Sequence, residues 1–454
     1  MNVSFSFDFG SAQRDILERA AVLLENGEGE RAKQVLCSLQ PKRISNALEA
    51  LVATQMFLDV HLLESALASV ERAAELDRYN PEVAELRAEC RYRLDLPTNL
   101  RAEGMAIRAT LERLNANAQG AGADANRRIH IVGQLNRIGG SERRALNLHR
   151  LLSPHMPTTL WSTLPVYPAH GIGREIRLIT PEVAPSDGTL VLIGNYYPCG
   201  NWLESNRFDR VIVCHNLVED NQKLLARLNQ IEKNSARPRV ELTFPSKMFR
   251  DLLGLPGKAE YSPVDLVQFH RERPPVASSS GLKIGRHGRA FSLKFHPNDP
   301  AFFRELLARG HQVKILGGTV IARTFSRDTG AKPDLIEAGT VEVTDFLSDL
   351  DVFLYRKHPQ WLETGGAVIL EAMAMEVPVV VFPEQCGCAE LFVHGENGFL
   401  VSSEAEALAI IERLRASPDL RKRIGSAGRR TMLELQQHGQ ETLAYYRDGY
   451  AAGE

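Results

Sequence analysis

One stretch of the sequence carries its most specific pattern: Glu363-Thr-Gly-Gly-Ala-Val-Ile-Leu-Glu371, followed by Ala-Met-Ala-Met-Glu-Val-Pro378 and the apolar run Val379 to Phe382. Two carboxylates stand eight positions apart, with two glycines between them. The pattern predicts a loop, a compact apolar helix opened by Glu371, and a strand after Pro378. A helix N-terminus has unpaired N–H groups and the positive end of the helix dipole, so this unit suits a phosphate or the hydroxyls of a sugar.

Length and composition indicate a multidomain globular protein. The chain has 454 residues, of which 44% are hydrophobic and 24% charged, and this length predicts about two or three domains. A net charge of −2 argues against a protein that coats nucleic acid. The sequence has no apolar run near the roughly 20 residues that span a bilayer and no secretory signal at its N-terminus. Six scattered cysteines lack zinc-site spacing, so we expect a cytoplasmic protein without a metal.

Residues 11–118 are rich in alanine and in apolar patterns of helical period, with almost no strand signal. They repeat at a spacing of 34 residues, which resembles tetratricopeptide repeats. We therefore expect a helical-repeat domain over 1–118, which either binds a protein partner or a second copy of the chain, or only stabilises the rest of the protein. The matching positions are Leu17 with Leu51, Leu24 with Leu58, Ala32 with Ala66, Leu36 with Val70, and Leu39 with Ala73.

A small, polar linker over 116–126 separates this helical part from a strand–loop–helix unit. The strand is predicted at Arg128–Val132, and the helix at Ser141–Leu152 with Ser141 as its N-cap. Together with the strands that follow, this unit predicts a Rossmann-like domain over 127–275, in which ligands bind at the carboxyl ends of parallel strands. The strands that follow are expected at Ile176–Ile179, Leu190–Ile193, Val211–Cys214 and Val240–Thr243.

A second linker by composition, over 271–281, precedes another α/β domain at 281–430. A charged helical segment follows, and its last part, 431–454, either stays outside or crosses back to the first Rossmann-like domain. The expected fold class is therefore α/β, with two Rossmann-like domains preceded by an all-α domain. The elements expected in the second domain are strands at Lys283–Ile284, Val313–Leu316 and Val352–Tyr355, a helix at Pro300–Arg309 and a turn at Gly317-Gly318.

A basic loop is expected after the first strand of the second domain. It contains Arg286, Arg289 and Lys294, with Gly285 and Gly288 allowing close backbone approach. Arginine offers a planar fork to phosphate oxygens, and lysine offers a point charge. Beside the paired glutamates, this loop predicts a clamp for a diphosphate, and a solvated basic loop is the alternative.

Glu363 and Glu371 have two possible chemical roles. They can act as an acid and a base, or they can accept hydrogen bonds from sugar hydroxyls, because an ionised carboxylate is only an acceptor. Two glutamates at the ends of a glycine-rich loop favour the binding of a polyol. The alternative is an ordinary helix N-terminus with acidic residues in its first turn.

The stretch from Glu363 to Pro378 resembles the E-x7-E signature of retaining nucleotide-sugar glycosyltransferases of the GT-B fold, the family-4-like "glycosyl transferases group 1". The resemblance extends over residues 128 to about 435 and implies two Rossmann-like domains that face a cleft. Four other segments occur in the order of that family: the glycine loop Gly139–Glu142, the stretch Tyr261–Phe269 that ends the first domain, the basic loop Arg286–Lys294, and Glu390–Leu400.

The resemblance implies a role for each residue of the donor site. Glu371 would hold the ribose hydroxyls of the nucleotide, and Glu363 would hold hydroxyls of the donor sugar. The amides of Gly365, Gly366 and Ala367 would face the sugar or the diphosphate.

The resemblance also implies how the leaving group is stabilised. Arg286 or Arg289, together with Lys294, would neutralise the leaving diphosphate, so electrostatic stabilisation would be the main catalytic effect and no metal would be required. His215 matches a first-domain histidine near the transferred sugar. The remaining donor-binding residues implied are Gly139, Gly140 and Gly317.

The sequence departs from the family pattern in the loop between the glutamates. The family has an aromatic residue before the second glycine, whereas this chain has Thr364-Gly365-Gly366. A bulky lid over the sugar is therefore missing. The segment before the loop, Tyr355–Trp361, is unusually basic, and it either contacts the acceptor or the diphosphate or is solvated.

Three further patterns have a structural and a functional interpretation. Asp349-Leu-Asp351 fits a metal-binding D-x-D, but it precedes a strand in a metal-independent context. Cys386-Gly-Cys388 fits a redox-active or metal-binding pair, or a turn built from small residues. The helix with Arg143, Arg144, His149 and Arg150 either lies on an anionic membrane or is an ordinary amphipathic surface helix.

The sequence thus predicts a retaining, metal-independent glycosyltransferase without a cofactor. The donor would be a UDP-, GDP- or dTDP-linked sugar, and the acceptor a glycan, a lipid-linked molecule or a protein. No nucleic-acid partner is expected, and membrane contact would be peripheral at most, at the inner face. The alternatives are a non-catalytic helical-repeat scaffold with a relic cleft, and a GT-B epimerase or phosphorylase.

Overall fold

The protein is described here by a computed structural model, which covers 12–25, 29–60, 62–77, 80–119, 128–136, 139–168, 175–271, 281–326, 328–359, 361–384, 386–437 and 439–448. The chain forms two compact units, Met1–Leu100 and Arg101–Glu454. Most of the two predicted linkers, 116–126 and 271–281, lies outside the described residues.

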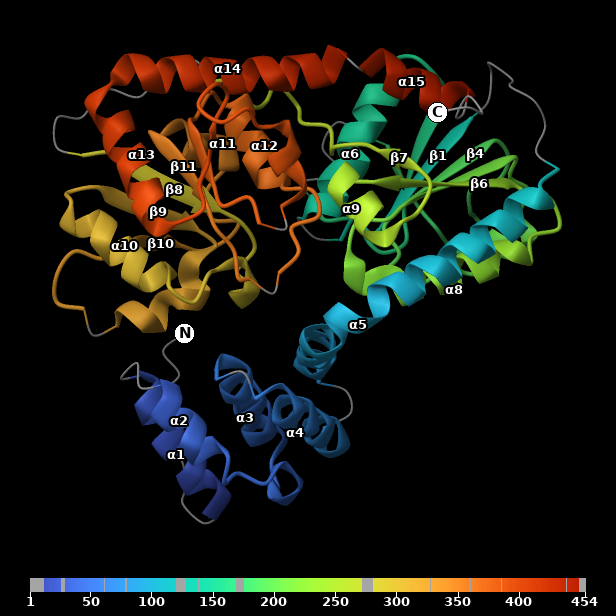
Figure 1. Ribbon diagram of the computed structural model, residues 1–454. Helices are drawn as coiled ribbons and strands as arrows, with labels where there is room; N and C mark the ends of the chain where they lie inside the picture. The colour runs from blue at the N-terminus through green and yellow to red at the C-terminus, as the bar shows by residue number, and fades with distance from the viewer. Residues whose placement is uncertain are drawn as a thin grey trace. The chain divides into compact units, whose positions relative to one another are not determined.

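The first unit is built from helix pairs (Figure 1). Helix α1 packs against α2, and α3 packs against α4. All but one of the ten residues matched at the 34-residue spacing are buried in one core, and Leu24 packs against that core. The expected all-α N-terminal part is confirmed, whereas its relation to tetratricopeptide repeats stays a prediction. The helices are α1 Ala12–Glu25, α2 Gly29–Leu36, α3 Ala47–Asp59, α4 Leu63–Leu76 and α5 Pro81–Ala116, of which α5 continues into the second unit.

The second unit begins its α/β part with a sheet of seven parallel strands in the order β3-β2-β1-β4-β5-β6-β7. The central strands β1, β4 and β5 are buried along their whole length, as expected for a parallel sheet covered on both faces. The strands are β1 Ile129–Gly133, β2 Thr158–Ser162, β3 Ile176–Leu178, β4 Thr189–Ile193, β5 Arg210–Cys214, β6 Arg239–Phe244 and β7 Lys258–Ala259, and the helices are α6 Gly140–Leu152, α7 Trp202–Ser205, α8 Asn221–Glu232 and α9 Lys247–Leu253.

A second parallel sheet follows, with the order β10-β9-β8-β11-β12-β13. In both sheets the chain moves outward from the first strand to one edge and then returns to the other side, so each sheet is doubly wound, as predicted. The strands are β8 Lys283–His287, β9 Gln312–Leu316, β10 Asp334–Ile336, β11 Val352–Tyr355, β12 Val379–Val381 and β13 Phe399–Leu400, and the helices are α10 Asp299–Ala308, α11 Val343–Ser348, α12 Ala367–Ala374, α13 Glu404–Ala416, α14 Pro418–Gln437 and α15 Gly439–Asp448.

The C-terminal helices connect the two sheets. Figure 1 shows α14 running from the second sheet's helices toward the first sheet, where α15 lies beside α6. In α15, the Tyr446 hydroxyl donates a hydrogen bond to Glu260 Oε2 at 2.8 Å. The Arg210 guanidinium donates to the carbonyl of Tyr445 at 2.8 Å. The last helix is therefore attached to the first Rossmann-like domain by buried polar contacts.

Three local predictions were wrong. Helix α12 begins at Ala367, so Glu371 lies in its second turn and does not open it. The helix begins there because Gly366 has a left-handed φ of 68°. Strand β8 continues to His287, so Arg286 belongs to the strand and not to a loop. Helix α6 begins at Gly140, so Gly139 and not Ser141 occupies its N-cap.

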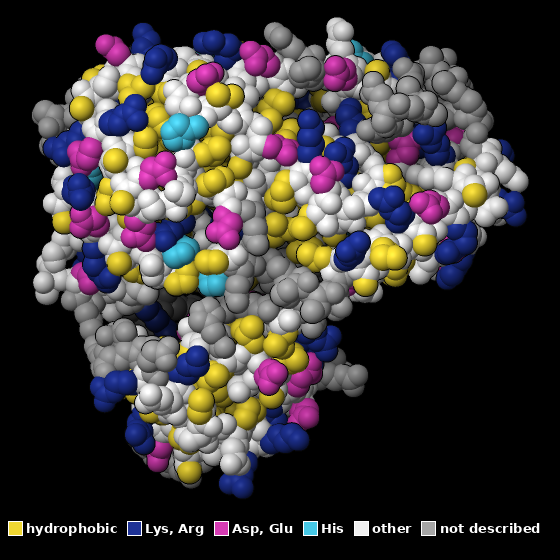
Figure 2. Space-filling model, viewed as in Figure 1, with side chains coloured by type: hydrophobic (Ala, Val, Ile, Leu, Met, Phe, Trp, Pro, Cys, Tyr) yellow, Lys and Arg dark blue, Asp and Glu magenta, His cyan; other side chains and the backbone are white. Residues whose placement is uncertain are grey.

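The surface shows no dominant charge on the side seen in Figure 2. Among the described residues there, Lys and Arg side chains are interspersed with Asp and Glu side chains, which agrees with the net charge of −2. Within the described part of the chain, none of the helices combines the length and apolar character needed to cross a membrane.

Candidate functional site

A cleft of about 600 Å³ lies between the two Rossmann-like domains of the second unit. Its walls come from the carboxyl ends of β8, β9 and β11, from the start of α12, and from the start of α6 in the first domain. In both sheets the strand order reverses beside the first strand, between β1 and β4 and between β8 and β11. Ligands bind at such reversal points because the loops after neighbouring strands leave in opposite directions there.

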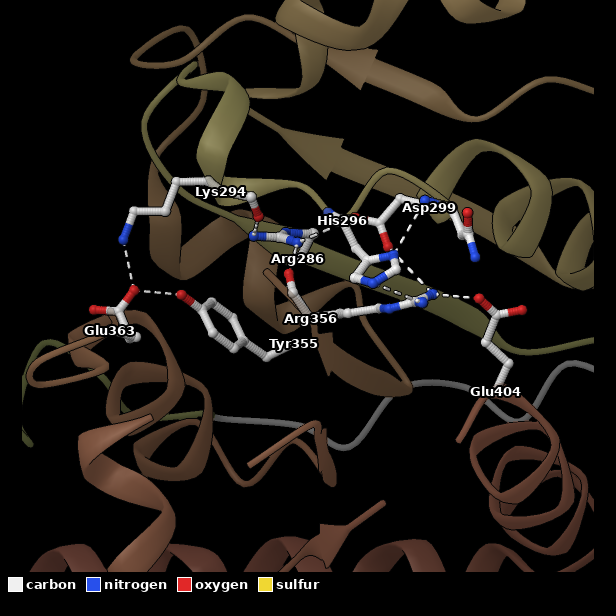
Figure 3. A network of polar contacts seen from close by, with 9 residues as sticks. Arg286, Lys294, His296, Asp299, Tyr355, Arg356, Glu363 and Glu404 are labelled. Carbon is white, nitrogen blue, oxygen red and sulfur yellow. Dashed lines mark hydrogen bonds and ion pairs between the residues drawn. The ribbon is translucent and has the colours of Figure 1, made fainter. Parts of the chain in front are cut away.

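Glu363 is held in the cleft by three donors (Figure 3). Its Oε2 accepts a hydrogen bond from Lys294 Nζ at 2.5 Å and another from the Tyr355 hydroxyl. Its Oε1 accepts from the Gly366 amide at 3.2 Å. Burial by itself would raise the pKa of Glu363, but the charge and hydrogen bond of Lys294 lower it to about 2. Glu363 is therefore an ionised acceptor and unsuited to donating a proton at neutral pH.

Glu371 is reached from both domains. Arg143 Nη1, on α6 of the first domain, lies 2.5 Å from Glu371 Oε1. His287 Nε2, at the end of β8, lies 3.2 Å from Glu371 Oε2, yet neither atom has a hydrogen-bond partner. Burial raises the pKa of Glu371, and the charge of Arg143 opposes this rise.

The two arginines of the predicted basic loop have different environments. Arg286 is buried, its Nη1 donates to the Arg356 carbonyl, and its Nη2 donates to the Lys294 carbonyl at 2.7 Å. Arg286 also lies 3.8 Å from Asp299, so the protein itself occupies its donors. Arg289 is exposed and lines the cleft. Within the described residues, the Arg289 guanidinium makes no hydrogen bond or ion pair, which leaves it available to a ligand.

The basic segment before Glu363 is not solvated, contrary to one of its two interpretations. Arg356, Lys357 and His358 are all buried. Figure 3 shows Arg356 pointing away from Glu363, toward Glu404 and Asp299. The Arg356 Nη1 donates to Glu404 Oε1 at 2.7 Å. These three residues support the sheet and do not line the cleft.

Among the described residues of this segment, Tyr355 and Trp361 line the cleft. The Lys294 ammonium lies 4.5 Å from the centroid of the Trp361 ring. A cation over an indole face is attracted by the ring quadrupole. Trp361 therefore helps to hold Lys294 beside Glu363.

The loop between the glutamates is fixed by the first domain. The Thr364 hydroxyl donates to the Asn216 carbonyl at 2.6 Å, and the Ser246 hydroxyl donates to the Thr364 carbonyl at 2.6 Å. Gly365 approaches Pro245 so closely that an added Cβ would lie 2.9 Å from the Pro245 Cβ. The position where the family has an aromatic residue thus contacts the opposite domain.

Most of the expected glycines lie at the cleft. Gly139 and Gly140 line it from the first domain, and Gly365, Gly366 and Ala367 line it from the second. Gly317 does not line the cleft, although its neighbour Leu316 does. A Cβ at Gly317 would lie 2.1 Å from the Gly288 carbonyl oxygen, so the absence of a side chain at Gly317 leaves room for the backbone at Gly288.

His215 is not brought into the cleft. Its side chain is fully buried, with Nδ1 near Asn195 Nδ2 at 3.1 Å and Nε2 near Asn221 Oδ1 at 2.7 Å. Burial lowers the pKa of His215 to about 4, so the ring is neutral. The next residue, Asn216, lines the cleft instead.

Two basic side chains of α6, Arg143 and Arg144, make contacts inside the protein, whereas contact of this helix with a membrane stays a prediction. Arg144 is buried and donates to Glu260 Oε2 at 3.1 Å and to Thr243 Oγ1 at 3.2 Å. Arg143 pairs with Glu371 across the cleft. Both side chains therefore form contacts within the protein.

The two remaining patterns, Asp349–Asp351 and Cys386–Cys388, lie in different environments. Asp349 accepts from Lys283 and Lys314, and Asp351 accepts from the Lys283 amide at 2.9 Å, before β11 begins. The sulfur atoms of Cys386 and Cys388 are 3.7 Å apart and buried. Among the described residues, no group of three or more His, Cys, Asp or Glu side chains is arranged to hold a metal.

Sequence reasoning did not find His287, Arg143 or Asn216 as parts of the site, and it named Trp361 only as the end of the segment Tyr355–Trp361. His287 was expected in a basic loop, and Arg143 on a helix that either lies on a membrane or is an ordinary surface helix. The signal for His287 was its place at the carboxyl end of a buried strand, where side chains face ligands. Arg143 carried no local signal, because its partner Glu371 is distant in the sequence.

The comparison with protein families gives one match. Residues 326–431 match the sequence profile of the family described as "Glycosyl transferases group 1". The matched region contains Glu363 and Glu371 but not Arg286 or Lys294. This stretch of the chain is similar to that family. The expected family resemblance is thereby confirmed for this part of the second Rossmann-like domain.

One curated relative is a protein named "Glycosyltransferase 1 domain-containing protein 1" from Xenopus tropicalis. It is 27% identical over 141 residues, which cover 29% of this chain. The aligned part spans 41% of the Xenopus protein. The likeness is therefore to less than half of that relative.

Similar solved structures extend over both Rossmann-like domains. A glycosyltransferase from Rickettsia africae covers 72% of this chain and 100% of its own, with a TM-score of 0.53 and 13% identity. Anabaena Alr3699/HepE, described in complex with UDP and glucose, covers 70% of this chain and 99% of its own, with a TM-score of 0.50 and 14% identity. At such identities the likeness shows the fold alone, and it confirms the GT-B fold expected from the sequence.

Proposed function

We propose that this protein is a retaining glycosyltransferase that transfers a sugar from a nucleotide-sugar donor to an acceptor hydroxyl. The observation that carries the proposal is the pair of buried carboxylates at one cleft, Glu363 and Glu371, on either side of the first turn of α12. Glu363 accepts hydrogen bonds and is strongly ionised. The group 1 domain and the UDP and glucose described with the Anabaena protein support the same conclusion.

The proposed donor-binding mode uses the different environments of the two carboxylates. Glu363 Oε1 accepts one hydrogen bond, from the Gly366 amide, so it can accept another from a sugar hydroxyl. Glu371 binds the nucleotide end. The diphosphate between them lies at the N-terminal turn of α12, where the amides of Gly365 and Ala367 and the positive end of the helix favour an anion.

The proposed catalytic effect is electrostatic. Arg289 and Lys294 neutralise the charge that develops on the leaving diphosphate. The bond between the sugar's anomeric carbon and the phosphate oxygen breaks, and a bond from that carbon to the acceptor oxygen forms on the same face. The acceptor proton passes to a phosphate oxygen of the departing nucleoside diphosphate. Lys294 moves from Glu363 to the phosphate as charge develops there.

The acceptor is proposed to be a glycan, a lipid-linked molecule or a protein. It would enter from the first-domain side of the cleft, which is lined by Asn136, Tyr167 and Asn147. The N-terminal helix pairs would hold the acceptor or a protein partner, or associate with a second copy of the chain.

The decisive experiment combines a donor screen with product analysis. A panel of nucleotide sugars is first tested by thermal shift, because a donor that binds the folded state raises its apparent stability. The donor found is then used in transfer assays, and the anomeric configuration of the product is determined by NMR. We expect an α-linked product from an α-linked donor. An inverted product would contradict retention, and conversion of the free donor to another nucleotide sugar would indicate an epimerase.

Variants test the two proposed anchors. Glu371→Ala and Lys294→Ala are expected to abolish transfer while their circular dichroism spectra remain those of a folded protein. Near-normal turnover by both variants would contradict the proposal. Absence of binding by every nucleotide tested would favour the scaffold interpretation.

A further inference from the structure

The second half of helix α5 packs against the first Rossmann-like domain, where it lies beside α8 (Figure 1). The helix is continuous from Pro81 to Ala116, so the chain that leaves the N-terminal unit becomes part of the second unit. Gly104 allows α5 to approach α9 closely, because an added Cβ would lie 2.2 Å from the Leu253 carbonyl oxygen. Helix α5 therefore contacts two elements of the first Rossmann-like domain, α8 and α9.

Glu103, on α5, accepts hydrogen bonds from the first turn of α8. Its Oε2 accepts from Asn221 Nδ2 at 2.8 Å, and its Oε1 accepts from Gln222 Nε2 at 2.7 Å. Asn221 is buried, and its side-chain oxygen Oδ1 lies 2.7 Å from His215 Nε2. The amide of Asn221 thereby joins a carboxylate on α5 to the imidazole that follows β5.

The direction of each hydrogen bond in this series follows from the groups that form it. An ionised carboxylate is only an acceptor, so Asn221 directs its NH2 group to Glu103 and its oxygen to His215. His215 Nε2 must then carry a proton. The buried ring has a lowered pKa and is neutral, so it has a single N–H, and its Nδ1 accepts from Asn195 Nδ2 at 3.1 Å. Glu103 therefore determines the tautomer of His215.

The residue after His215 holds the loop 364–366 between the two glutamates, the donor loop. The Asn216 carbonyl accepts a hydrogen bond from the Thr364 hydroxyl at 2.6 Å. Helix α9, the other element that α5 contacts, is capped by Ser246, whose hydroxyl donates to the Thr364 carbonyl at 2.6 Å. Both elements that α5 contacts are therefore linked to the same residue of the donor loop.

We propose that Glu103 is a positioning residue for the donor loop. Its carboxylate fixes Asn221 and, through it, the ring of His215. The carbonyl of the next residue is thereby kept in place for the Thr364 hydroxyl. The helix that leaves the N-terminal unit then contributes to the geometry of the donor loop and does more than stabilise the protein. This inference rests on the proposed function, because the loop that is positioned is the one proposed to bind the donor.

A first experiment measures the tautomer of His215 in the absence of nucleotide. The full-length chain is prepared with isotope-labelled histidine for nitrogen NMR, and the His215 signals are identified by their loss in His215→Gln. We expect the proton on Nε2 in the wild type and a mixture of both tautomers in Glu103→Ala, because the Asn221 amide can then rotate. An unchanged tautomer in Glu103→Ala would overturn the proposed link between Glu103 and His215.

A second experiment measures nucleotide binding by calorimetric titration of full-length variants. The ligand is whichever of UDP, GDP and ADP binds the wild type most tightly. We expect Glu103→Ala to bind it about threefold more weakly, because the donor loop is held less firmly. Glu103→Gln keeps an acceptor for the Asn221 amide, so it should bind like the wild type. An equal loss in Glu103→Gln and Glu103→Ala would contradict the proposed series of hydrogen bonds.

Arg113→Ala is the matched control for the packing of α5. Arg113 Nε pairs with Glu232 Oε1 at 2.5 Å, so this variant also removes a contact between α5 and α8, but one outside the series that leads to His215. It should bind nucleotide like the wild type. Equal affinities of Glu103→Ala and Arg113→Ala would overturn the inference while leaving the proposed function intact. Absence of binding by the wild type would contradict the proposed function itself.

A double-mutant cycle with the donor loop gives the sharpest outcome. Thr364→Val removes the hydrogen bond to the Asn216 carbonyl, through which Glu103 is proposed to act. In the Thr364→Val background, Glu103→Ala should therefore have almost no further effect on nucleotide affinity. If Glu103→Ala weakens binding by the same factor in both backgrounds, Glu103 does not act through the donor loop.

Discussion

At the scale of single residues, most charged side chains of the site are paired with one another. A ligand must therefore compete with these ion pairs. Lys294 is paired with Glu363, and Arg143 with Glu371. Arg289 is the cleft arginine without such a partner among the described residues. A diphosphate therefore meets one available guanidinium and must compete with Glu363 for Lys294. This competition favours binding modes in which the sugar hydroxyls replace Lys294 at Glu363.

The Glu363 pair has a testable dependence on pH. The folded-state pKa of Glu363 is lowered to about 2, so its ionisation stabilises the folded state above the unfolded pKa of about 4.3. This stability is lost as the pH falls from about 4.3 toward 2. We expect Glu363→Gln to be about 2 kcal/mol less stable than wild type at pH 7. Urea unfolding from pH 7 to pH 2.5 should show the difference shrinking, and a difference independent of pH would contradict the assignment.

The two arginines of β8 and its following loop should respond differently to truncation. Arg286→Ala removes one of the two arginines near the buried Asp299 and leaves the Arg356 and Lys294 carbonyls without their donor, so we expect a loss of about 2 kcal/mol in the free energy of unfolding. Arg289→Ala should leave stability unchanged and weaken nucleoside diphosphate binding about tenfold. Arg323, which is exposed on the same domain and does not line the cleft, gives the control Arg323→Ala. Equal effects of Arg289→Ala and Arg323→Ala on binding would exclude Arg289 from the site.

At the scale of elements, the start of α12 decides where the carboxylates and amides meet. Gly366 reverses the chain with a φ of 68°, after which Ala367 begins the helix. An added Cβ at Gly366 would lie 2.3 Å from the Cys388 sulfur. The position therefore needs glycine both for its conformation and for the space beside the 3₁₀ turn Gly387–Leu391.

The contributions of backbone strain and of crowding at Gly366 can be separated by comparison with another glycine of positive φ. Gly395 also has a positive φ, of 79°, but an added Cβ would meet no atom within 4 Å. Gly395→Ala should cost about 1 kcal/mol of stability through strain alone. Gly366→Ala should cost at least about 2 kcal/mol, because repulsion by Cys388 is added to the strain, and it should also abolish nucleotide binding. Similar unfolding temperatures for the two variants would show that Cys388 moves aside freely.

At the scale of the second unit, the two Rossmann-like domains meet at the donor loop. Thr364 accepts a hydrogen bond from Ser246 and donates one to the Asn216 carbonyl, and Arg143 reaches Glu371. These contacts join the sides of the cleft at the residues that are proposed to bind the donor. We therefore expect closure of the domains on a donor to be coupled to order in the loop.

The Thr364 hydroxyl provides the test of this coupling. Thr364→Val removes the donor to Asn216 with little change of shape, whereas Thr364→Ser keeps the hydroxyl. We expect Thr364→Val to weaken nucleotide binding about fivefold, which corresponds to about 1 kcal/mol for one hydrogen bond, and Thr364→Ser to bind like wild type. Small-angle scattering with and without nucleotide should show incomplete compaction of the Val variant. If both variants behave identically, the Thr364 hydroxyl does not contribute to this coupling.

The sequence by itself determined the features that depend on neighbours along the chain. Apolar periodicity predicted the strands of both sheets except short or mixed ones such as β2 and β7, and the 34-residue spacing predicted the helix pairs. The E-x7-E pattern located Glu363 and Glu371. Such signals can be predicted because side chains a few positions apart share one face of a helix or strand.

The tertiary structure decided which charged groups are available to a ligand. Only the fold brings Arg143 to Glu371, Lys294 to Glu363 and Asp299 to Arg286, and only the fold removes His215 from the cleft and brings His287 to it. The members of these pairs lie on different elements, so a local sequence pattern does not indicate which cation pairs with which carboxylate. Burial then determines which of those groups remains charged or unpaired, because desolvation depends on every element that surrounds the group.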